Sequence, residues 1–363
     1  MKCTDSSNKP TRKIRSGSAA ARKRKQAIRK RRRIIRRMLV LLVLLFGAAV
    51  GLFIKLNGKA ETYAAEYEAS SYNKSIYRGA LYSADLCVAS ENINMDGAPG
   101  SGSLKAGALF DVEGKNVDYA YNIHEKMYPA SLTKLMTALV ALEKGDLSDT
   151  VTVSANADST GFAADEQTCG ILEGDTLTLE DLLSGLLIYS GNDNAVAIAE
   201  HIAGSEDKFA DMMNEKAQEI MATNSHFVNS NGLHDDNHYT TAYDLYLIFN
   251  ECIKYDKFVE IISADSYTAK VTGADGTVRD IKWEPTNYYA LGDAPLPKTG
   301  KVIGGKTGTT LKAGNCLILL DESESGSKYI SIVMGANTKE ILYQDMTAII
   351  ENIPANAKTD QEE

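Results

Sequence analysis

The order of the hydrophobic patterns along the chain constrains its fold more than any other feature of the sequence. Residues 105–121 have the alternation of two short strands joined by a turn. Apolar residues then recur at helical spacing through most of residues 129–254. Strand patterns return after residue 265, and a last helical pattern covers residues 339–353. Strands on both sides of a long helical insert predict an α+β fold, a mostly antiparallel sheet flanked by helices with an inserted all-helical subdomain.

Individual segments carry clear local signals. Thr178 followed by Asp181 has the spacing of a capping box, and Ser190-Gly191 interrupts the helical pattern around it. We expect helices at residues 129–145, 206–222 and 240–254, two more within residues 176–205, and strands at residues 80–90, 266–272, 277–283, 301–310, 315–321 and 329–336.

Charge is divided unequally along the chain. Residues 1–37 hold 16 Lys and Arg and one acidic residue, Asp5, so they carry +15, and the net charge of −9 leaves −24 for the remainder. Residues 38–54 follow directly and contain no charged side chain. A helix of this length is about 25 Å long and spans a bilayer if flanking Arg37 and Lys55 extend to the headgroups.

This arrangement predicts a single-pass protein of the cell membrane. Because positive residues stay in the cytoplasm, the acidic bulk of the chain is expected outside the cell. The apolar segment exceeds a typical signal-peptide core, which favours a retained anchor at residues 38–54; secretion after cleavage near Ala60 is the alternative. Since an apolar span follows it, the basic run is expected to set topology, with no nucleic-acid partner.

The cysteines do not form a recognisable framework. Cys3 falls in the basic segment, and the others are far apart and form no C-x-x-C pair: Cys87, Cys169, Cys252 and Cys316. Buried free thiols are expected, although a location outside the cytoplasm permits a disulfide and leaves the pairing open.

Ser131-Leu132-Thr133-Lys134 is an S-x-x-K sequence at the start of an expected helix. The i, i+3 spacing places Ser131 and Lys134 on one face, one turn apart. A lysine can remove the proton of a serine when burial and a nearby cation lower the lysine pKa. The first helical turn also directs backbone N–H groups at a developing oxyanion. By itself the pattern is common and fits an ordinary solvated lysine better.

Ser190-Gly191-Asn192 lies at the expected helix break, about 60 residues further on. A hydroxyl at this point can pass a proton to a leaving amine, and an amide can hold a carbonyl group or the lysine. Alone, these three residues indicate only a turn.

The tripeptide Lys-Thr-Gly occurs twice, at residues 298–300 and at residues 306–308. The first copy follows two prolines and is expected in an exposed turn. The second lies in a strand pattern, and a strand edge can pair with a peptide. Lys306 and the hydroxyls of Thr307 and Thr309 can hold a carboxylate, while Gly308 permits close approach.

In this order, the three motifs resemble those of the penicillin-recognising serine enzymes, which include penicillin-binding proteins and serine β-lactamases. Across about residues 105–350 the chain is similar to the low-molecular-weight serine D-Ala-D-Ala carboxypeptidases. The similarity is carried by the blocks "PASLTKLMTALVALE", "LEGDTLTLEDLLSGLLIYSGNDNAVAIAEHIAG", "NSNGLHDDNHYTTAYDL" and "GGKTGTTLKAGNCLI".

The resemblance implies an enzyme that removes the terminal D-Ala from peptidoglycan stem pentapeptides and is inhibited by β-lactams, with no cofactor or metal. Ser131 would attack the carbonyl and Lys134 would be its base, while Ser190 would pass the proton towards the departing D-Ala. The backbone N–H groups of Ser131 and Thr309 would form the oxyanion hole. The implied catalytic residues are Ser131, Lys134, Ser190 and Asn192, and the implied substrate-binding residues are Lys306, Thr307, Gly308 and Thr309.

The sequence departs from this family in two places. Many members continue into a small β-rich domain and an amphipathic membrane-binding helix, whereas this sequence ends at Glu363, so the N-terminal span is expected to supply the anchoring. Many members also carry an arginine after the strand equivalent to residues 329–336, where this sequence offers only Lys339. Carboxylate recognition is therefore expected to depend more on Lys306 and the threonines, or activity is expected to be reduced.

Two related functions share part of this pattern. A class A-like β-lactamase adds a glutamate within E-x-x-x-N, which does not occur between residues 192 and 306; Glu219 and Asn224 miss the spacing by one residue. A β-lactam-acylated sensor would need an intracellular effector, for which residues 1–37 are too short and too basic.

A zinc peptidase is the alternative with different chemistry. His234 and His238 lie close together with two aspartates between them, but there is no H-E-x-x-H or E-x-x-H motif. The sequence around them is rich in Gly and Asn, so we expect surface-loop residues.

The expected organisation has five parts. They are a basic cytoplasmic tail at residues 1–37, a transmembrane signal-anchor at 38–54, a stalk and linker at 55–104, a DD-peptidase domain at 105–353 and a polar tail at 354–363.

Overall fold

The computed structural model describes residues 23–43, 45–47, 85–100 and 102–354 and divides the chain into two units, Met1–Ala80 and Leu81–Glu363. The described part of the first unit is helical. Among the described residues, no helix is both long enough and apolar enough to cross a membrane. Much of the expected anchor, the cleavage point near Ala60 and most of the stalk lie outside the described residues, so these remain predictions.

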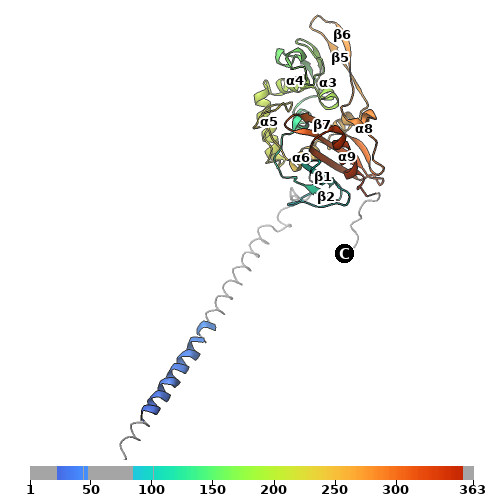
Figure 1. The fold of residues 1–363 in the computed structure, drawn as a ribbon. Coiled ribbons are helices and arrows are strands. Elements are labelled where there is room, and N and C mark those ends of the chain that lie inside the picture. The colour runs from blue at the N-terminus through green and yellow to red at the C-terminus, as the bar shows by residue number, and fades with distance from the viewer. Residues whose placement is uncertain (1–22, 44, 48–84, 101, 355–363) are drawn as a thin grey trace, which may run out of the picture. The chain divides into compact units, whose positions relative to one another are not determined.

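A five-stranded antiparallel sheet forms the centre of the second unit (Figure 1). Its strands are β1 (Ala106–Asp111), β2 (Asn116–Tyr121), β7 (Lys301–Thr310), β8 (Gly314–Glu322) and β9 (Lys328–Ala336). The strand order is β2-β1-β9-β8-β7, so the first hairpin joins the late strands where β1 pairs with β9. Strand β7 lies at the edge of the sheet. The predicted α+β class with a mostly antiparallel sheet is confirmed.

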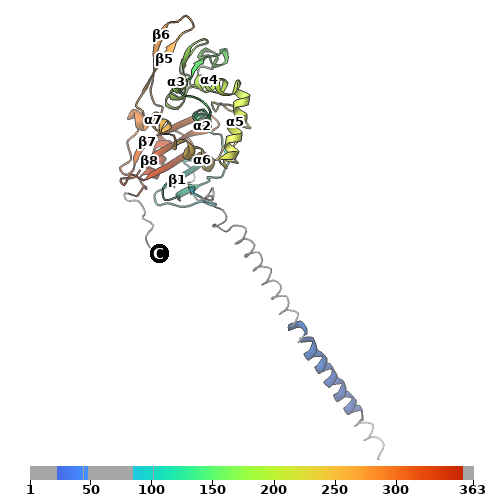
Figure 2. The same cartoon turned by 180° about the vertical axis from the view of Figure 1, so that it is seen from behind.

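Helices cover both faces of this sheet. Helix α9 (Lys339–Ile350) packs on one face, as Figure 1 shows. Helix α6 (Ala242–Cys252) packs on the other, with α2 (Lys134–Lys144) beside it, as Figure 2 shows from behind. The sheet is therefore the middle layer of three.

The sequence of β8 reflects this position between two layers. Leu317 and Leu319 belong to the apolar cluster under α9, whereas Ile318 and Leu320 belong to the main core on the opposite face. Side chains alternate between the faces of a strand, so a strand covered on both sides needs a continuous apolar run.

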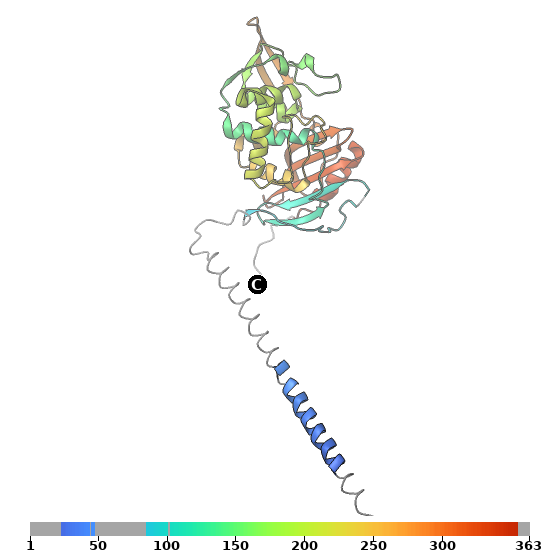
Figure 3. The ribbon, with the colours of Figure 1, turned by 90° about the vertical axis from the view of Figure 1, so that its left-hand side faces the viewer.

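The segment between β2 and β7 is not wholly helical. The strands predicted at residues 266–272 and 277–283 are confirmed, but the prediction that the insert before them is all-helical is wrong. The segment contains a second sheet of β3 (Thr150–Thr152), β4 (Thr176–Thr178), β5 (Tyr267–Thr272) and β6 (Val278–Trp283), in that order. Besides α2 and α6, this segment contains the helices α3 (Leu179–Ser184), α4 (Asn192–Ala203), α5 (Glu206–Glu219) and α7 (Asp256–Ile262). Figure 3 shows these green and yellow helices beside the central sheet.

The reason for this second sheet is visible in the burial of its strands. In β5, Ala269 and Val271 are buried while their neighbours are exposed or half-buried, so the hairpin of β5 and β6 has one apolar face. Such a ribbon suits a sheet covered on one side only. Strands β3 and β4 are three residues long, too short for their pattern to stand out in the sequence.

Residues 85–90 form no strand, contrary to the expectation for residues 80–90; residues 80–84 lie outside the described part. Their backbone groups bond to tyrosine hydroxyls instead. The N–H of Cys87 donates to the hydroxyl of Tyr246, and the hydroxyl of Tyr243 donates to the carbonyl of Cys87. The expectation of buried free thiols is confirmed for Cys87, Cys169, Cys252 and Cys316.

Asp321 lies in β8, the strand that is covered on both faces, and its pKa tests how completely that strand is buried. Its side chain is fully buried, one carboxylate oxygen has no partner among the described residues, and burial raises its pKa to about 7. The unfolded carboxyl ionises near pH 3.8, so this group makes folding less favourable as pH rises from about 4 to 7, with no further change above. In Asp321→Asn, the free energy of unfolding relative to wild type should rise over this range by about 3 kcal/mol, at about 1.4 kcal/mol per pKa unit.

Urea titrations at pH 4.5 and 7.5 measure this difference. The matched control is Asp280→Asn, which changes an exposed aspartate of β6. A constant difference between Asp321→Asn and wild type at the two pH values would contradict the prediction.

Candidate active site

Ser131 lies in a 3₁₀ turn, η2 (Ala130–Thr133), and Lys134 is the first residue of α2. The S-x-x-K motif therefore sits at the predicted helix start, although a tighter turn precedes the helix. The Nζ atom of Lys134 lies 3.1 Å from Ser131 Oγ. The motif brings a hydroxyl and an amine into direct contact.

Lys134 is completely buried, and its amine faces three oxygen atoms. Besides Ser131 Oγ, these are Asn192 Oδ1 and the carbonyl oxygen of Asn231, each at 2.7 Å. Burial lowers the pKa of Lys134 to about 7. A neutral amine has two N–H groups and one lone pair, and the two carbonyl oxygens accept only. The lone pair of the neutral form therefore points at the hydroxyl of Ser131, as a base must.

The turn that holds Ser131 has an unusual backbone. Ala130 has φ +50°, a left-handed conformation that is costly for a residue with a Cβ. Gly232, with φ +88°, lies so close that a Cβ there would come within 1.9 Å of the Ala130 carbonyl oxygen. The glycine thus allows the 229–232 loop, which supplies the Asn231 carbonyl, to press against the turn.

His238 is buried and contacts the turn that carries Ser131, so its interpretation as a surface-loop residue is wrong. The side chain is buried; Nδ1 accepts from the N–H of Val228, and Nε2 contacts Thr133 Oγ1 at 2.8 Å. Because Nδ1 accepts, Nε2 carries the proton and donates to Thr133, whose hydroxyl donates to the Ala130 carbonyl. Two hydrogen bonds in series, from His238 to Thr133 and from Thr133 to Ala130, thus fix the carbonyl group of Ala130, the residue with the strained backbone.

His234 does remain at the surface of its loop, 3.4 Å from Asp236. Within the described part of the chain, no group of three or more His, Cys, Asp or Glu side chains is placed to hold a metal ion.

Ser190 is positioned by a distortion in the helix before it. A π-helical turn, η5 (Gly185–Tyr189), ends at Ser190, which has φ +70°, and α4 begins at Asn192. This is the predicted break, and π turns are frequent at functional sites. The Nζ of Lys306 donates to Ser190 Oγ at 2.7 Å. Lys306 is also buried, and burial together with the nearby Lys134 holds its pKa well below the usual value.

The second Lys-Thr-Gly copy lies on the edge strand β7, directly beside the Ser131 turn. A Cβ at Gly308 would meet the backbone nitrogens of Ser131 and Leu132 at 3.1 Å, so only glycine lets the strand come this close without movement. The hydroxyl of Thr307 contacts that of Thr286 at 2.6 Å, and the hydroxyl of Thr309 donates to Asn315 Oδ1.

The first copy lies elsewhere, at the C-terminal end of α9. The N–H of Lys298 donates to the carboxylate of Glu351, Gly300 packs against Ile350, and the Lys298 side chain is exposed. The structure therefore separates the two copies: Thr307 and Gly308 of the second copy line the catalytic cleft, with Lys306 buried behind it, whereas the first copy does not line it.

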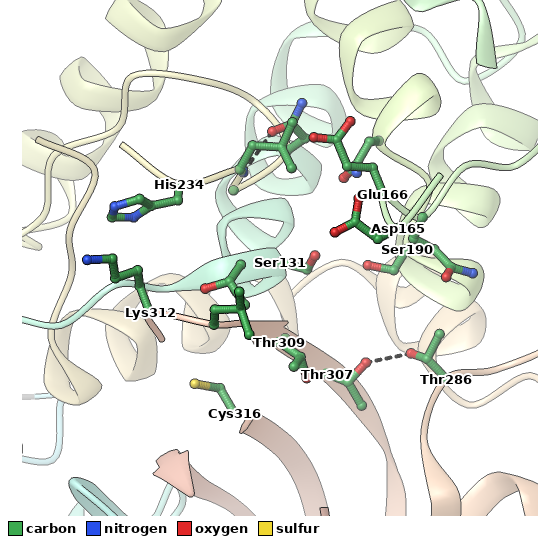
Figure 4. A pocket seen from close by; sticks show the side chains of 18 of the residues that line it. Ser131, Asp165, Glu166, Ser190, His234, Thr286, Thr307, Thr309, Lys312 and Cys316 are labelled. Carbon is green, nitrogen blue, oxygen red and sulfur yellow. Dashed lines mark hydrogen bonds between the residues drawn. The ribbon is translucent and has the colours of Figure 1, made fainter. Parts of the chain in front are cut away.

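The cleft has a volume of about 760 Å³ and is lined by the motif residues Ser131, Ser190, Asn192, Thr307, Gly308 and Thr309 (Figure 4). In Figure 4, His234 and Lys312 lie at one end, Thr286 and Ser190 lie towards the other, and Ser131 lies between them. The cleft also receives Asp165, Glu166, Gln167, Tyr288 and Lys339.

Several contributors carried no signal in the sequence. Asn231 acts through its backbone carbonyl, and Thr286 lies far from any motif. Asp193, in the first turn of α4, accepts backbone N–H groups from residues 169–171 and so fixes that segment against the helix. Its position after Ser190-Gly191-Asn192 is the one feature that could have drawn attention to it.

A serine facing a buried lysine, with a second serine–lysine pair and a strand edge across the cleft, is the arrangement expected of serine enzymes that form acyl intermediates. Residues 98–338 match the peptidase S11 family, described as D-alanyl-D-alanine carboxypeptidase. The chain belongs to this family, which confirms the predicted resemblance.

Individual relatives agree with this assignment. The chain is 32% identical over 255 residues to D-alanyl-D-alanine carboxypeptidase DacF of Bacillus subtilis, covering 68% of this chain and 61% of that protein. It is 31% identical to DacC of Escherichia coli, covering 68% of this chain and 60% of DacC. The chain thus spans about three fifths of the length of these curated relatives.

Solved structures show the same fold. The Streptomyces K15 DD-transpeptidase has a TM-score of 0.63 at 25% identity, covering 72% of this chain and 97% of that one. Penicillin binding protein 5 from Haemophilus influenzae has a TM-score of 0.59 at 29% identity, covering 69% of each chain.

The role of His238 as a support leads to a prediction. His238→Ala removes the donor to Thr133, and we expect about tenfold slower acylation by a fluorescent penicillin and a loss of about 1–3 kcal/mol in stability. Burial lowers the His238 pKa to about 4, so the ring is neutral near pH 7. The loss should therefore be the same factor at every pH from 5.5 to 8.5.

His201→Ala, which breaks only a partly exposed contact to Asp149, is the matched control. A loss in His238→Ala that varies with pH would instead indicate a titrating role.

Proposed function

We propose that this protein is a serine-type D-Ala-D-Ala carboxypeptidase that trims peptidoglycan stem peptides outside the cytoplasmic membrane, anchored by residues 38–54. The observation that carries the proposal is the buried amine of Lys134, held between Ser131 Oγ, Asn192 Oδ1 and the Asn231 carbonyl. The names of its relatives, carboxypeptidases and a DD-transpeptidase, support the substrate class.

Acylation begins at Ser131. The neutral amine of Lys134 takes the hydroxyl proton while Ser131 Oγ attacks the carbonyl carbon between the two D-alanines. The backbone N–H of Ser131 and that of Thr309 receive the resulting oxyanion. The approach of Gly308 to the Ser131 amide supports this, because it brings β7 against the turn that carries Ser131.

The departing D-Ala needs a proton on its nitrogen. Ser190 accepts a hydrogen bond from Lys306, so its own hydroxyl proton is free to point into the cleft. It passes that proton to the leaving amine and recovers one from the neighbouring lysines. Water then attacks the acyl carbonyl with Lys134 again as base, releasing the shortened peptide and free Ser131.

The terminal carboxylate binds at β7. Lys306 supplies the positive charge, and the hydroxyls of Thr307 and Thr309 supply donors, with Gly308 leaving room between them. Lys339, the first residue of α9, also lines the cleft with its Nζ 4.9 Å from the centre of the Tyr288 ring. We assign it the long-range attraction that an arginine provides in many relatives.

The base role of Lys134 makes the pH dependence testable. Because the free amine is the active form and its pKa is about 7, acylation should slow about tenfold for each pH unit below 7 and level off above about pH 8. Stopped-flow labelling of the purified full-length chain with a fluorescent penicillin measures this rate. A rate independent of pH from 5.5 to 9 would contradict the assignment of Lys134.

The doubled Lys-Thr-Gly sequence supplies a matched pair of variants. Lys306→Ala should slow acylation by at least about 100-fold, because the carboxylate loses its cation and Ser190 its partner. Lys298→Ala should stay within about twofold of wild type. Equal effects of the two substitutions would overturn the assignment of β7.

Release of D-Ala from a D-Ala-D-Ala peptide, with Ser131→Ala as the blank, separates the alternatives. Covalent label without release of D-Ala favours a β-lactam-acylated sensor. Rapid loss of the label with release of hydrolysed penicillin favours a class A-like β-lactamase. No label at all, or label that persists in Ser131→Ala, overturns the mechanism.

A further inference from the structure

A second pocket, of about 650 Å³, adjoins the catalytic cleft and has no part in the chemistry above. It lies where the start of the first hairpin and the loop before η2 meet the β7–β8 turn. We call it the Lys312 pocket, because Lys312 lines both this pocket and the cleft. Its wall is formed mainly by Lys105, Tyr121, Lys126, Tyr128, Tyr239 and Lys312.

The pocket offers unpaired positive charge. Within the described ranges, none of its three lysines, Lys105, Lys126 and Lys312, forms a salt bridge. Lys126 instead lies over the ring of Tyr239, with Nζ 4.0 Å from its centre.

Two carboxylates also line the pocket and do not cancel this charge. Asp236 lies 3.4 Å from His234 and accepts a hydrogen bond from the hydroxyl of Tyr128, and Glu125 is the second carboxylate. Three ammonium groups against two carboxylates leave one net positive charge, which suits an anionic group.

The turn that carries Lys312 is held in one conformation. The N–H of Ala313 donates to Thr310 Oγ1 at 3.0 Å, and Gly314 has φ +76° with its backbone against Gly335. Lys312 thus projects from a fixed support at the end of the cleft, beside His234 in Figure 4.

The direction of a bound peptide leads from the cleft to this pocket. If the terminal carboxylate binds at Lys306 and Thr307, as the proposed function holds, the scissile carbonyl lies beside Gly308 and the preceding residues continue along β7 towards Thr310. A peptide paired this way runs antiparallel to the edge strand. With one peptide residue beside each strand residue, the residue two positions before the acyl D-Ala comes level with Thr310, the last residue of β7, and Lys312 follows two residues later in the β7–β8 turn, within reach of a lysine side chain.

We propose that the Lys312 pocket is a subsite for a carboxylate carried by the substrate two residues before the acyl D-Ala. The ligand is a peptide with an acidic residue, such as a γ-linked glutamate with a free α-carboxylate, at that position. Lys312 meets the carboxylate first, Lys126 and Lys105 complete the positive field, and the tyrosine rings pack against the peptide. The subsite would select for unamidated stem peptides over amidated ones.

The test compares peptides that differ only at this group. The full-length chain is given L-Ala-γ-D-Glu-L-Lys-D-Ala-D-Ala and the same peptide with the α-carboxylate as an amide, and kcat/KM for D-Ala release is measured for each. We expect wild type to prefer the carboxylate about tenfold, which corresponds to about 1.4 kcal/mol. The preference should shrink as salt is raised, since exposed charges are screened.

Substitutions then locate the preference. In Lys312→Met, the ratio of kcat/KM for the carboxylate peptide to kcat/KM for the amide peptide should fall to about one, and in Lys126→Met it should fall to about three. In Lys312→Glu the ratio should invert, so that the amide peptide is preferred. Lys270→Met, an exposed lysine of the β5 hairpin, should keep the wild-type ratio. Because the readout is a ratio on one enzyme, a general loss of activity does not imitate the result.

Each outcome decides between the two proposals. D-Ala release with equal kcat/KM for both peptides in wild type, or a ratio unchanged in Lys312→Glu, overturns the subsite and leaves the proposed function standing. No release from either peptide, despite penicillin labelling of Ser131, overturns the proposed function and the subsite with it.

Discussion

The burial of one amine, that of Lys134, is the interaction on which the site depends. An ordinary lysine would be charged at neutral pH and could not accept a proton from Ser131. Full burial lowers its pKa to about 7, and two carbonyl oxygens occupy the N–H groups that would otherwise face the serine. The same burial would be expensive without those acceptors, because an unsatisfied polar group in the core costs free energy. The proposed base role of Lys134 and the packing of its side chain therefore need the same contacts.

Those contacts come from segments that are distant in the sequence. Asn192 is the first residue of α4 and follows a π turn, and Asn231 lies in a loop that packs against the Ser131 turn. The edge strand β7 packs against the same turn at Gly308. Glycine makes both close approaches possible, at residues 232 and 308. The strain at Ala130 persists because Thr133 and His238 fix its carbonyl oxygen. A small shift in any of these segments would move an acceptor away from the amine.

The sequence predicted the parts of this arrangement that have local causes. The capping box at Thr178, the break at Ser190 and the distinction between the two Lys-Thr-Gly copies each follow from a few adjacent residues. What it missed depends on tertiary contacts. His238 is buried only because distant elements cover its loop, and Asn231 acts through a carbonyl that any residue possesses. Strands β3 and β4 are too short to show an alternating pattern in the sequence. A strand was expected at residues 80–90, but the backbone N–H and carbonyl of Cys87 form hydrogen bonds with tyrosine hydroxyls and not with a neighbouring strand.

The two buried lysines beside the cleft also bear on how acid and base roles would be divided in the proposed mechanism. Burial disfavours the charged form of both Lys134 and Lys306, and the charge of Lys134 further lowers the pKa of Lys306, so the pair resists being doubly protonated. The buried carboxylate of Asp193 favours the charged form of Lys134, and that carboxylate accepts hydrogen bonds from the backbone N–H groups of residues 169–171. In the proposed mechanism, a substrate carboxylate at β7 brings a negative charge beside Lys306 and favours its protonation. Lys134 would then remain the neutral base and Lys306 would be the proton donor behind Ser190, so the proposed division of roles follows from where the substrate places its charge.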